Sequence, residues 1–417
     1  MLYWKDMETV KLDRFVPGGQ AIGTLNSGKK AFVWGGLPGE VVEFRVTKRK
    51  RSYIEGIVTK VIEASPHRTS HRDTCYLATS PWQVVNYDHE LEQKTLLVKE
   101  AFRQEKISAS IGSTVTDGGE YFYRNKMEYS LYWSNETESV ELAFHERGSH
   151  RKVPITSSSL ERPEVLDEAK LVVNGINERG EEARTYSSLV VRCNQQGIAQ
   201  SLLFLKNQPH LQGIALTDTL LGRQFSYSPN GFFQINLPVY ELALSEIKKH
   251  INTSTVVDMY AGVGTIGLTA AADRQLTLVE TNKAAFTELV ENCGLSLMGS
   301  AQPRRTLASN SAAASAAQHY LNAPSPILAR SEDALEHITA QATIIVDPPR
   351  AGLDPKVVNR LLEVKPPTII YLSCNPTTQA RDIAPLLKSY KITLAQPYNF
   401  FPHTPHIENL VVLERCK

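Results

Sequence analysis

The chain has 417 residues, too many for one hydrophobic core, so we expect two or three domains. Its apolar content of 42% and charged content of 21% are ordinary for a soluble globular protein. The five scattered cysteines argue against a disulfide framework and for a reducing compartment. Because the sequence contains neither an apolar signal segment near its start nor a run of about 18 to 20 apolar residues, we expect a cytoplasmic protein without membrane contact.

The first part of the chain, residues 1–66, predicts a small OB-like β-barrel. Residues 8–59 alternate in polarity like short strands, with expected strands at 41–46 and 53–58 and glycine-containing turns between them. The cationic run Lys48 to Arg51 falls in this segment. It can neutralise nucleic-acid phosphates or be an ordinary solvated surface, because the net charge of +1 does not decide between these alternatives.

Residues 67–225 predict a second domain of mixed α+β type. Apolar residues recur at helical spacing over 87–106, and we expect this helix to pack on the C-terminal domain. Strands are expected at 127–132 and 188–192, with a helix between residues 164 and 179.

From residue 226 to 417 the chain alternates strands and helices, which predicts a Rossmann-like, mostly parallel, doubly wound α/β sheet. The expected strands are 255–258, 276–280, 342–347 and 368–372. The stretch 300–325 is rich in Ala, Ser, Asn and Pro, and we expect an insertion or an irregular surface helix without an assigned function.

A glycine-rich turn follows the first of these strands. The spacing Gly262-x-Gly264-x-x-Gly267 lets the backbone turn tightly and approach a ligand. Glu280 ends the next strand, where a carboxylate can accept both hydroxyls of a ribose. The pairing fits a nicotinamide dinucleotide or S-adenosylmethionine, and Asp258 with the aromatic-Ala-Gly-x-Gly run favours the latter. Alternatively, the glycines serve only to pack helix against strand.

Cys374 follows the strand 368–372, at the strand end where α/β sheets gather their chemistry. Taken alone, it is either a nucleophile or a buried packing thiol. Asp347-Pro348-Pro349-Arg350 closes another strand, and its prolines fix the backbone so that Asp347 and Arg350 face the same crevice.

A reaction at carbon-5 of uracil would give the thiol of Cys374 a catalytic role. Carbon-5 of uracil is a poor nucleophile until a group such as a thiolate adds to carbon-6, which is covalent catalysis. The scheme also needs a base to remove the carbon-5 proton. Glu408, just before an expected last strand at 410–413, can reach the same crevice, although a Glu at such a position is usually a solvated surface residue.

Five ordered motifs resemble those of the S-adenosylmethionine-dependent RNA 5-methyluridine methyltransferases with an N-terminal TRAM domain. They are residues 232–236, 258–267, 347–350, 373–376 and 401–408, and the resemblance covers nearly the whole chain. It implies Cys374 as the nucleophile and Glu408 as the base. It also implies a cofactor site of Gln234, Tyr260, Gly262, Gly264, Thr265, Glu280 and Asp347, and a uracil site of Gln234, Asp347 and Arg350. Thr265 stands where many relatives carry Asn.

The resemblance also implies the partners. The barrel would hold RNA, with large-subunit (23S) ribosomal RNA favoured over the T-loop of transfer RNA, and we expect a monomer. RNA cytosine-C5 methylation is disfavoured because the Asp347-to-Arg350 motif contains no Cys. A non-catalytic RNA-binding factor is disfavoured because Cys374 and Glu408 are both present.

One departure from the family concerns metal. Many relatives hold an iron–sulfur cluster with four cysteines, but here Cys75 stands alone. Ser80 and the run 157–159 occupy regions where further ligands would be expected. One thiolate cannot hold such a cluster, so we expect neither an iron–sulfur cluster nor another metal.

Overall fold

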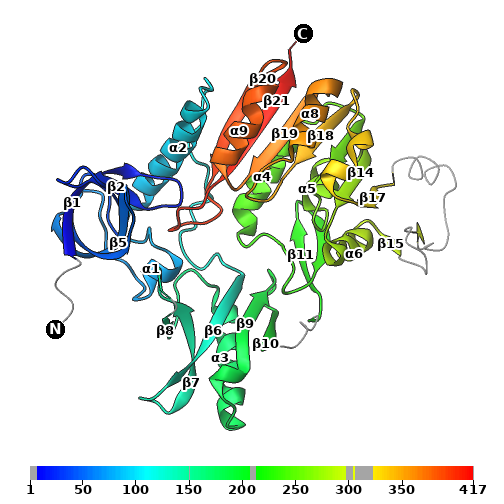
Figure 1. Ribbon diagram of the computed structural model, residues 1–417. Coiled ribbons are helices and arrows are strands. Elements are labelled where there is room, and N and C mark those ends of the chain that lie inside the picture. The colour runs from blue at the N-terminus through cyan, green and yellow to red at the C-terminus, as the bar shows by residue number, and fades with distance from the viewer. Residues whose placement is uncertain (1–6, 150, 207–212, 297–303, 306–322, 417) are drawn as a thin grey trace.

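The structure is a computed structural model that describes residues 7–149, 151–206, 213–296, 304–305 and 323–416. Within these ranges the chain forms a closed barrel, a five-stranded central sheet and a seven-stranded sheet flanked by helices (Figure 1). This arrangement confirms the expected fold class. None of the helices in these ranges is long and apolar enough to cross a membrane. Most of the segment 300–325, where we expect an insertion, lies outside the described residues.

The N-terminal barrel closes because its fourth strand pairs with both the first and the fifth. The strands are β1 (Met7–Phe15), β2 (Ala21–Thr24), β3 (Lys30–Trp34), β4 (Val41–Arg49) and β5 (Tyr53–Glu63), in the order β1-β2-β3-β5-β4. Val10, Leu12 and Phe44 are among the alternating side chains that fill its interior. Closure leaves no exposed sheet edge. Trp82 belongs to the same core and packs on Phe15, with 4.5 Å between ring centroids.

Helix α2 (Tyr87–Gln104) connects the barrel to the large sheet, and a short helix α1 (Tyr76–Thr79) precedes it. Asn86 begins α2, because its side-chain oxygen accepts the backbone N–H groups of Asp88 and His89. The buried side chains of Val98 and Phe102 enter a core shared with the large sheet. The helix therefore lies between the barrel and the sheet, against α9 and β20 (Figure 1).

The central domain is an antiparallel sheet covered by one long helix. Its strands are β6 (Lys126–Ser134), β7 (Ser139–His145), β8 (Lys152–Pro154), β9 (Tyr186–Cys193) and β10 (Ala199–Leu205), in the order β10-β9-β6-β7-β8. The helix is α3 (Pro163–Glu178), followed by the 3-10 turn η1 (Ala183–Thr185). Val165, Ala169, Val173 and Ile176 recur at helical spacing, are buried and pack on the sheet.

A hairpin then leads into the last part of the chain. It consists of β11 (Leu216–Leu220) and β12 (Arg223–Tyr227), which pair antiparallel. Phe225 and Tyr227 pack in the same core as the helices α4 (Leu237–Lys249), α5 (Thr265–Ala270) and α6 (Lys283–Asn292). By its packing, the hairpin therefore belongs with the large sheet.

The seven-stranded sheet has the order β17-β14-β13-β18-β19-β21-β20. Its strands are β13 (Thr255–Asp258), β14 (Gln275–Glu280), β17 (Ser325–Leu328), β18 (Ala342–Val346), β19 (Thr368–Ser373), β20 (Tyr390–Tyr398) and β21 (Glu408–Arg415). The first five strands in spatial order are parallel, and β21 runs antiparallel to both of its neighbours, β19 and β20. The remaining elements are the pair β15 (Leu295–Ser296) and β16 (Arg304–Arg305), the turns η2 (Ser331–Asp333) and η3 (Leu335–His337), and the helices α8 (Pro355–Val364) and α9 (Pro376–Leu386).

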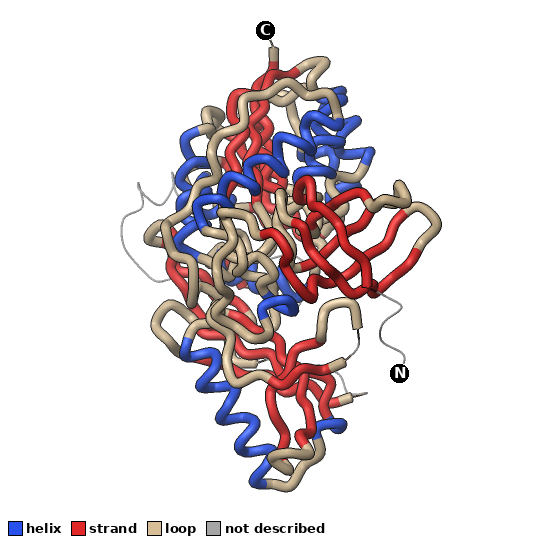
Figure 2. The backbone as a smooth tube through the Cα atoms, turned by 90° about the vertical axis from the view of Figure 1, so that its left-hand side faces the viewer, coloured by secondary structure: helices blue, strands red, loops and turns tan. Residues whose placement is uncertain are grey.

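Both faces of this sheet are buried, which explains its continuous apolar strands. Alternate side chains point to opposite faces, so Ile345 enters the core under α4 to α6 while Ile344 enters the core under α2, α8 and α9. Figure 2 shows the strands of this sheet, in red, between helices.

The last strand begins earlier than we expect from the sequence. Glu408 is the first residue of β21 and pairs with Tyr398, whereas the apolar run alone places the strand at 410–413. The difference arises because a polar residue can occupy a strand when its backbone pairs with a neighbour. The alternative in which Glu408 is a solvated surface residue does not hold, since Glu408 is buried.

Candidate active site

Three groups named from the sequence meet at one edge of the seven-stranded sheet. Asp347 follows β18 and Cys374 follows β19, and these neighbouring strands are parallel. Glu408 begins β21, which runs antiparallel to β19, so its first residues lie at the same edge. The sheet topology therefore brings together residues that are up to 61 positions apart in the sequence (408 minus 347).

The thiol of Cys374 is half-buried, and burial is the main reason why its pKa is raised to about 11. The nearby carboxylates of Glu408 and Asp347 raise the pKa further, whereas Arg350 lowers it by its charge and by a hydrogen bond. A thiolate here therefore depends on a positive charge close to the sulfur.

Both carboxyl groups favour their protonated forms. Burial, and then the charge of Asp347, raise the pKa of Glu408 well above its usual value, while Arg350 opposes this. Burial, and then Asp258, raise the pKa of Asp347 to about 8. Two carboxyl groups in one dry site cannot easily both ionise, so they titrate as a pair.

The Asp347-to-Arg350 turn is fastened to the start of α9. The carbonyl oxygen of Arg350 accepts hydrogen bonds from Asn375 Nδ2 at 3.0 Å and Thr378 Oγ1 at 3.2 Å. The side chain of Arg350 contacts His406, with 3.3 Å between Arg350 Nη2 and His406 Nδ1. Arg350 thus joins the ends of β18, β19 and β21. Sequence reasoning missed the contribution of His406, because no local pattern indicates this contact.

The glycine-rich turn combines a packing role with an open surface. Gly264 has φ +93° and begins α5, and a Cβ there would lie 2.7 Å from the side chains of Leu268 and Leu289. Gly262 has φ +55°, and a Cβ there would meet no atom within 4 Å. Gly264 therefore has a packing role, whereas Gly262 leaves space for a ligand.

Carboxylates on both sides hold this turn. Glu280 accepts the backbone N–H of Gly262 at 2.8 Å and that of Asn282 at 2.6 Å. Buried Asp258 accepts the N–H of Gly267 at 3.1 Å, and burial raises the pKa of Asp258 to about 7. A carboxylate has about four acceptor positions, so Glu280 can also accept ribose hydroxyls. The turn therefore fits a nucleoside ligand.

Three further cofactor candidates lie close to the turn or to the loop before α4. The hydroxyl of Thr265 lies 2.7 Å from that of Tyr240, a residue that sequence reasoning missed. Tyr260 is half-buried against the core beneath α8 and α9. Gln234 is buried, and its carbonyl oxygen accepts a hydrogen bond from Asn125 Nδ2 at 3.2 Å.

The central domain holds the loop that carries Gln234. Arg192 of β9 is fully buried and donates to the carbonyl oxygens of Gly231, at 3.0 Å, and of Phe233. Lys126 adds a hydrogen bond of 2.9 Å to the carbonyl oxygen of Asn230. The local sequence contains no signal for these contacts, because they join residues at least 39 positions apart.

The region around Cys75, where the resemblance leads us to look for cluster ligands, contains a hydrogen-bond network. Gln83 Nε2 donates to Asp73 Oδ2 and Ser80 Oγ, both at 2.7 Å, and Asp73 accepts the backbone N–H of Ser159 at 2.9 Å. Cys75 is buried in the core of the central domain. Within the described ranges, no group of three or more His, Cys, Asp or Glu residues is suited to a metal ion. The expected absence of a cluster stays a prediction.

The basic run of the barrel is partly neutralised. Lys48 pairs with Glu55 at 2.9 Å and Arg49 with Glu8 at 3.3 Å. Surface ion pairs of this kind are weak and exchangeable, so these side chains can still turn to phosphates.

In comparisons with known proteins, the N-terminal and C-terminal parts of the chain each match a known family. Residues 188–416 match the family described as tRNA (Uracil-5-)-methyltransferase, and residues 7–59 match the TRAM domain. A protein of Bacillus cereus described as an uncharacterized RNA methyltransferase is 27% identical over 97% of this chain and 96% of its own length. One of Treponema denticola with the same description is 27% identical over 98% of this chain and 99% of its own length.

Among solved structures, the chain is similar to the tRNA (uracil-54, C5)-methyltransferase of Pyrococcus abyssi in complex with S-adenosyl-L-homocysteine. The TM-score is 0.73, at 20% identity, covering 97% of this chain and 99% of that one. The two proteins therefore share their fold along almost their whole lengths.

Proposed function

Because the chain belongs to the tRNA (uracil-5-)-methyltransferase family of S-adenosylmethionine-dependent RNA methyltransferases, we propose that it methylates carbon-5 of a uridine through a covalent bond from Cys374 to carbon-6. The observation that carries this proposal is the meeting of Cys374, Glu408 and Arg350 at one sheet edge. A thiol, a base and a cation are the groups that this reaction needs.

Cys374 acts first in the proposed reaction. Its thiolate adds to carbon-6, and the electron pair of the carbon-5–carbon-6 bond moves towards the carbonyl at carbon-4. Arg350 favours this step because its positive charge opposes the rise in the pKa of the thiol. The resulting enolate makes carbon-5 nucleophilic.

Glu408 acts last. After carbon-5 has gained its methyl group, Glu408 takes the carbon-5 proton, the double bond re-forms, and the sulfur of Cys374 leaves as thiolate. A carboxylate whose pKa is raised by burial is a stronger base than an exposed one. It must first lose its own proton, which Arg350 favours by opposing the rise in pKa.

S-adenosylmethionine supplies the methyl group as an electrophile when it is bound. The residues that would hold it are those around the glycine-rich turn and the loop before α4: Gln234, Tyr260, Gly262, Gly264, Thr265, Glu280 and Asp347. The open space at Gly262 supports this assignment, as does the spare acceptor capacity of Glu280.

Uracil would be held by Asp347, Gln234 and Arg350. With its pKa raised to about 8, Asp347 carries a proton at neutral pH and can donate a hydrogen bond to a carbonyl oxygen. The amide of Gln234 can both donate and accept. Together these groups match the alternating acceptors and donor along the uracil edge.

We propose that the substrate is large-subunit ribosomal RNA, because TRAM-bearing members of the family that this chain resembles often methylate that RNA. The transfer-RNA uridine is the second candidate, favoured by the names of the family and of the Pyrococcus abyssi neighbour. Either target must present its base outside the stack.

The test is to map 5-methyluridine in total RNA from a strain lacking this gene and from the same strain complemented with wild type or Cys374→Ala. We expect one uridine to lose its methyl group and to regain it with wild type alone. Restoration by the alanine variant would contradict the covalent mechanism. Loss of 5-methyluridine at a transfer-RNA position would show that the substrate is transfer RNA and not ribosomal RNA.

A further inference from the structure

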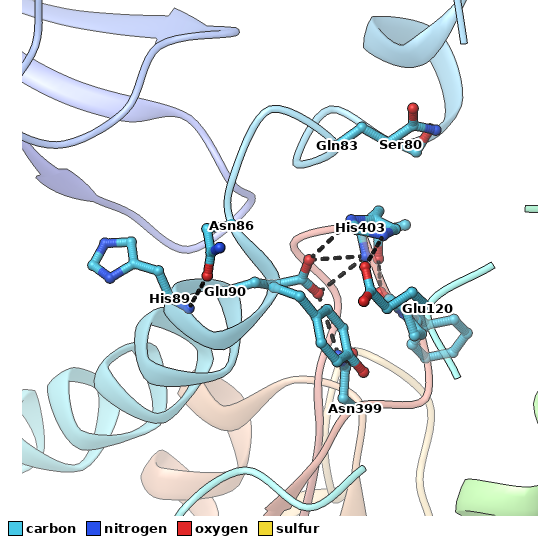
Figure 3. A network of polar contacts seen from close by, with 12 residues as sticks. Ser80, Gln83, Asn86, His89, Glu90, Glu120, Asn399 and His403 are labelled. Atoms are coloured by element: carbon cyan, nitrogen blue, oxygen red, sulfur yellow. Dashed lines mark hydrogen bonds and ion pairs between the residues drawn. The ribbon is translucent and has the colours of Figure 1, made fainter. Parts of the chain in front are cut away.

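Two fully buried charges of α2 lie against the loop between β20 and β21. Glu90 and Lys94 stand one helical turn apart with no exposed side-chain surface, and Lys94 Nζ lies 2.8 Å from Glu90 Oε1. In Figure 3 the Glu90 carboxylate points away from the helix towards His403 of the loop. The proposed reaction uses none of these three residues.

Both charges hold the loop. The two oxygens of Glu90 accept the backbone N–H of His403, each at 3.0 Å, and Oε1 accepts Asn399 Nδ2 at 3.3 Å. Lys94 Nζ donates to Asn399 Oδ1 at 2.5 Å and to the carbonyl oxygen of Phe401 at 3.0 Å. One helix therefore fixes the loop at three positions.

His403 is held in a conformation that it would rarely adopt alone. Its φ is +60°, in the left-handed region, where a residue other than glycine persists only when its surroundings fix it. Its carbonyl oxygen accepts the backbone N–H of Trp82 at 3.1 Å, and its imidazole stacks on Tyr121 with 4.3 Å between ring centroids. The imidazole nitrogens face Glu90 at 3.4 Å and Glu120 at 3.3 Å.

The fixed positions adjoin the proposed base. Asn399 directly follows Tyr398, the residue that pairs with Glu408 across the hairpin. The loop from Asn399 to His403 therefore determines how the chain enters β21 at Glu408. A buried ion pair is costly and is often replaceable by apolar residues without loss of stability. Its hydrogen bonds to the loop give this pair a specific use.

We propose that Glu90, acting with Lys94 through Asn399 and His403, is a positioning residue that sets Glu408 for removal of the carbon-5 proton. The proposal rests on the proposed function, in which Glu408 is the base. Glu90 touches no reacting atom. Its loss therefore slows the last step of the reaction, after the thiol has added and the methyl group has moved.

The test uses Glu90→Gln and the double variant Glu90→Gln/Lys94→Met in the full chain. The double variant matters because Glu90→Gln alone leaves a buried lysine without its partner charge and can unfold the protein. We expect turnover on uridine RNA to fall about 10- to 100-fold, the range for a displaced catalytic group. We also expect a covalent RNA–protein adduct to accumulate on ordinary uridine RNA. Adduct formation on 5-fluorouridine RNA should stay at the wild-type rate, because that reaction needs no proton removal.

Glu100→Gln is the matched control, since Glu100 lies on the same helix in a pair with the exposed Arg103. It should leave turnover and adduct formation unchanged. The proposal is overturned if the folded double variant turns over like wild type, or if both adducts decline together. If Cys374→Ala still methylates RNA, the proposed function fails, whatever the Glu90 variants do.

Discussion

Ser373 pairs with Asn409 across the antiparallel strands β19 and β21. The residues next to this pair are Cys374, which comes directly after Ser373, and Glu408, which precedes Asn409. The pair therefore brings the thiol and the carboxyl group to the same sheet edge, where the first and last steps of the proposed reaction need them.

Replacing Cys374 by Ala should abolish methyl transfer and adduct formation with 5-fluorouridine RNA. The expected loss of activity is at least about a thousand-fold, because a missing nucleophile cannot be replaced by the rest of the site. RNA binding, measured by filter retention, should persist. Cys416→Ala removes an exposed thiol and is the control. Residual methylation by Cys374→Ala would contradict the assignment.

Replacing Glu408 by Gln should trap the enzyme on ordinary uridine RNA as a methylated covalent adduct. Gln cannot take the carbon-5 proton, so the sulfur cannot leave. In wild type, release of the product should become faster as the pH rises, because the raised pKa of Glu408 keeps it protonated at lower pH. Denaturing gels and rapid-quench kinetics measure the two effects. A variant that turns over without accumulating adduct would exclude Glu408 as the base.

Asp347 should make the protein less stable as the pH rises. Its pKa is raised from an ordinary 3.8 to about 8, so the folded state binds more protons than the unfolded state between these values. The stability it contributes is full below about pH 4 and is lost as the pH approaches 8, with a slope of up to about 1.4 kcal/mol per pH unit. Urea unfolding of Asp347→Asn should show a flatter pH profile than wild type. Asp273→Asn, at an exposed position, should not.

The two glycines of the turn should respond differently to Ala. Gly264→Ala should lower the free energy of unfolding by about 1–3 kcal/mol, because its φ is +93° and the new Cβ meets two leucines. Gly262→Ala should mainly weaken the binding of S-adenosylhomocysteine, since its Cβ enters the open space. Calorimetry and thermal unfolding measure these effects. Gly28→Ala, also at positive φ in open space, controls for backbone strain. Unchanged affinity in Gly262→Ala would remove this residue from the cofactor site.

Replacing Arg192 by Met should destabilise the protein by about 2 kcal/mol or more. The carbonyl oxygen of Phe233 would lose the Arg192 donor, and an unsatisfied buried group costs about 1–3 kcal/mol. The carbonyl oxygen of Gly231 would keep only the hydrogen bond from Lys126 Nζ, at 3.2 Å. We also expect a higher KM for the substrates, because the same loop carries Gln234. Arg184→Met, in an exposed ion pair, should change stability by less than about 0.5 kcal/mol. An unchanged KM would contradict a role of this loop in substrate binding.

The sequence by itself determined the fold class, the barrel and most strand positions, and it identified Asp347, Cys374 and Glu408 as candidates for one site. Each of these rests on local information, namely the alternation of apolar residues and the rule that parallel strands gather chemistry at one edge. It also indicated the family, through five ordered motifs.

Only the tertiary structure decided which distant groups hold these candidates. Lys94 contacts Asn399 across 305 positions, and Arg192 holds the Gln234 loop across 39 positions or more. It also placed Glu408 within β21 and buried it. Such contacts join single side chains to remote backbone groups, and a hydrogen bond of this kind leaves no periodicity in either segment. The sequence therefore determines the candidates for the chemistry, and the packing of α2 and the central domain around them decides their geometry.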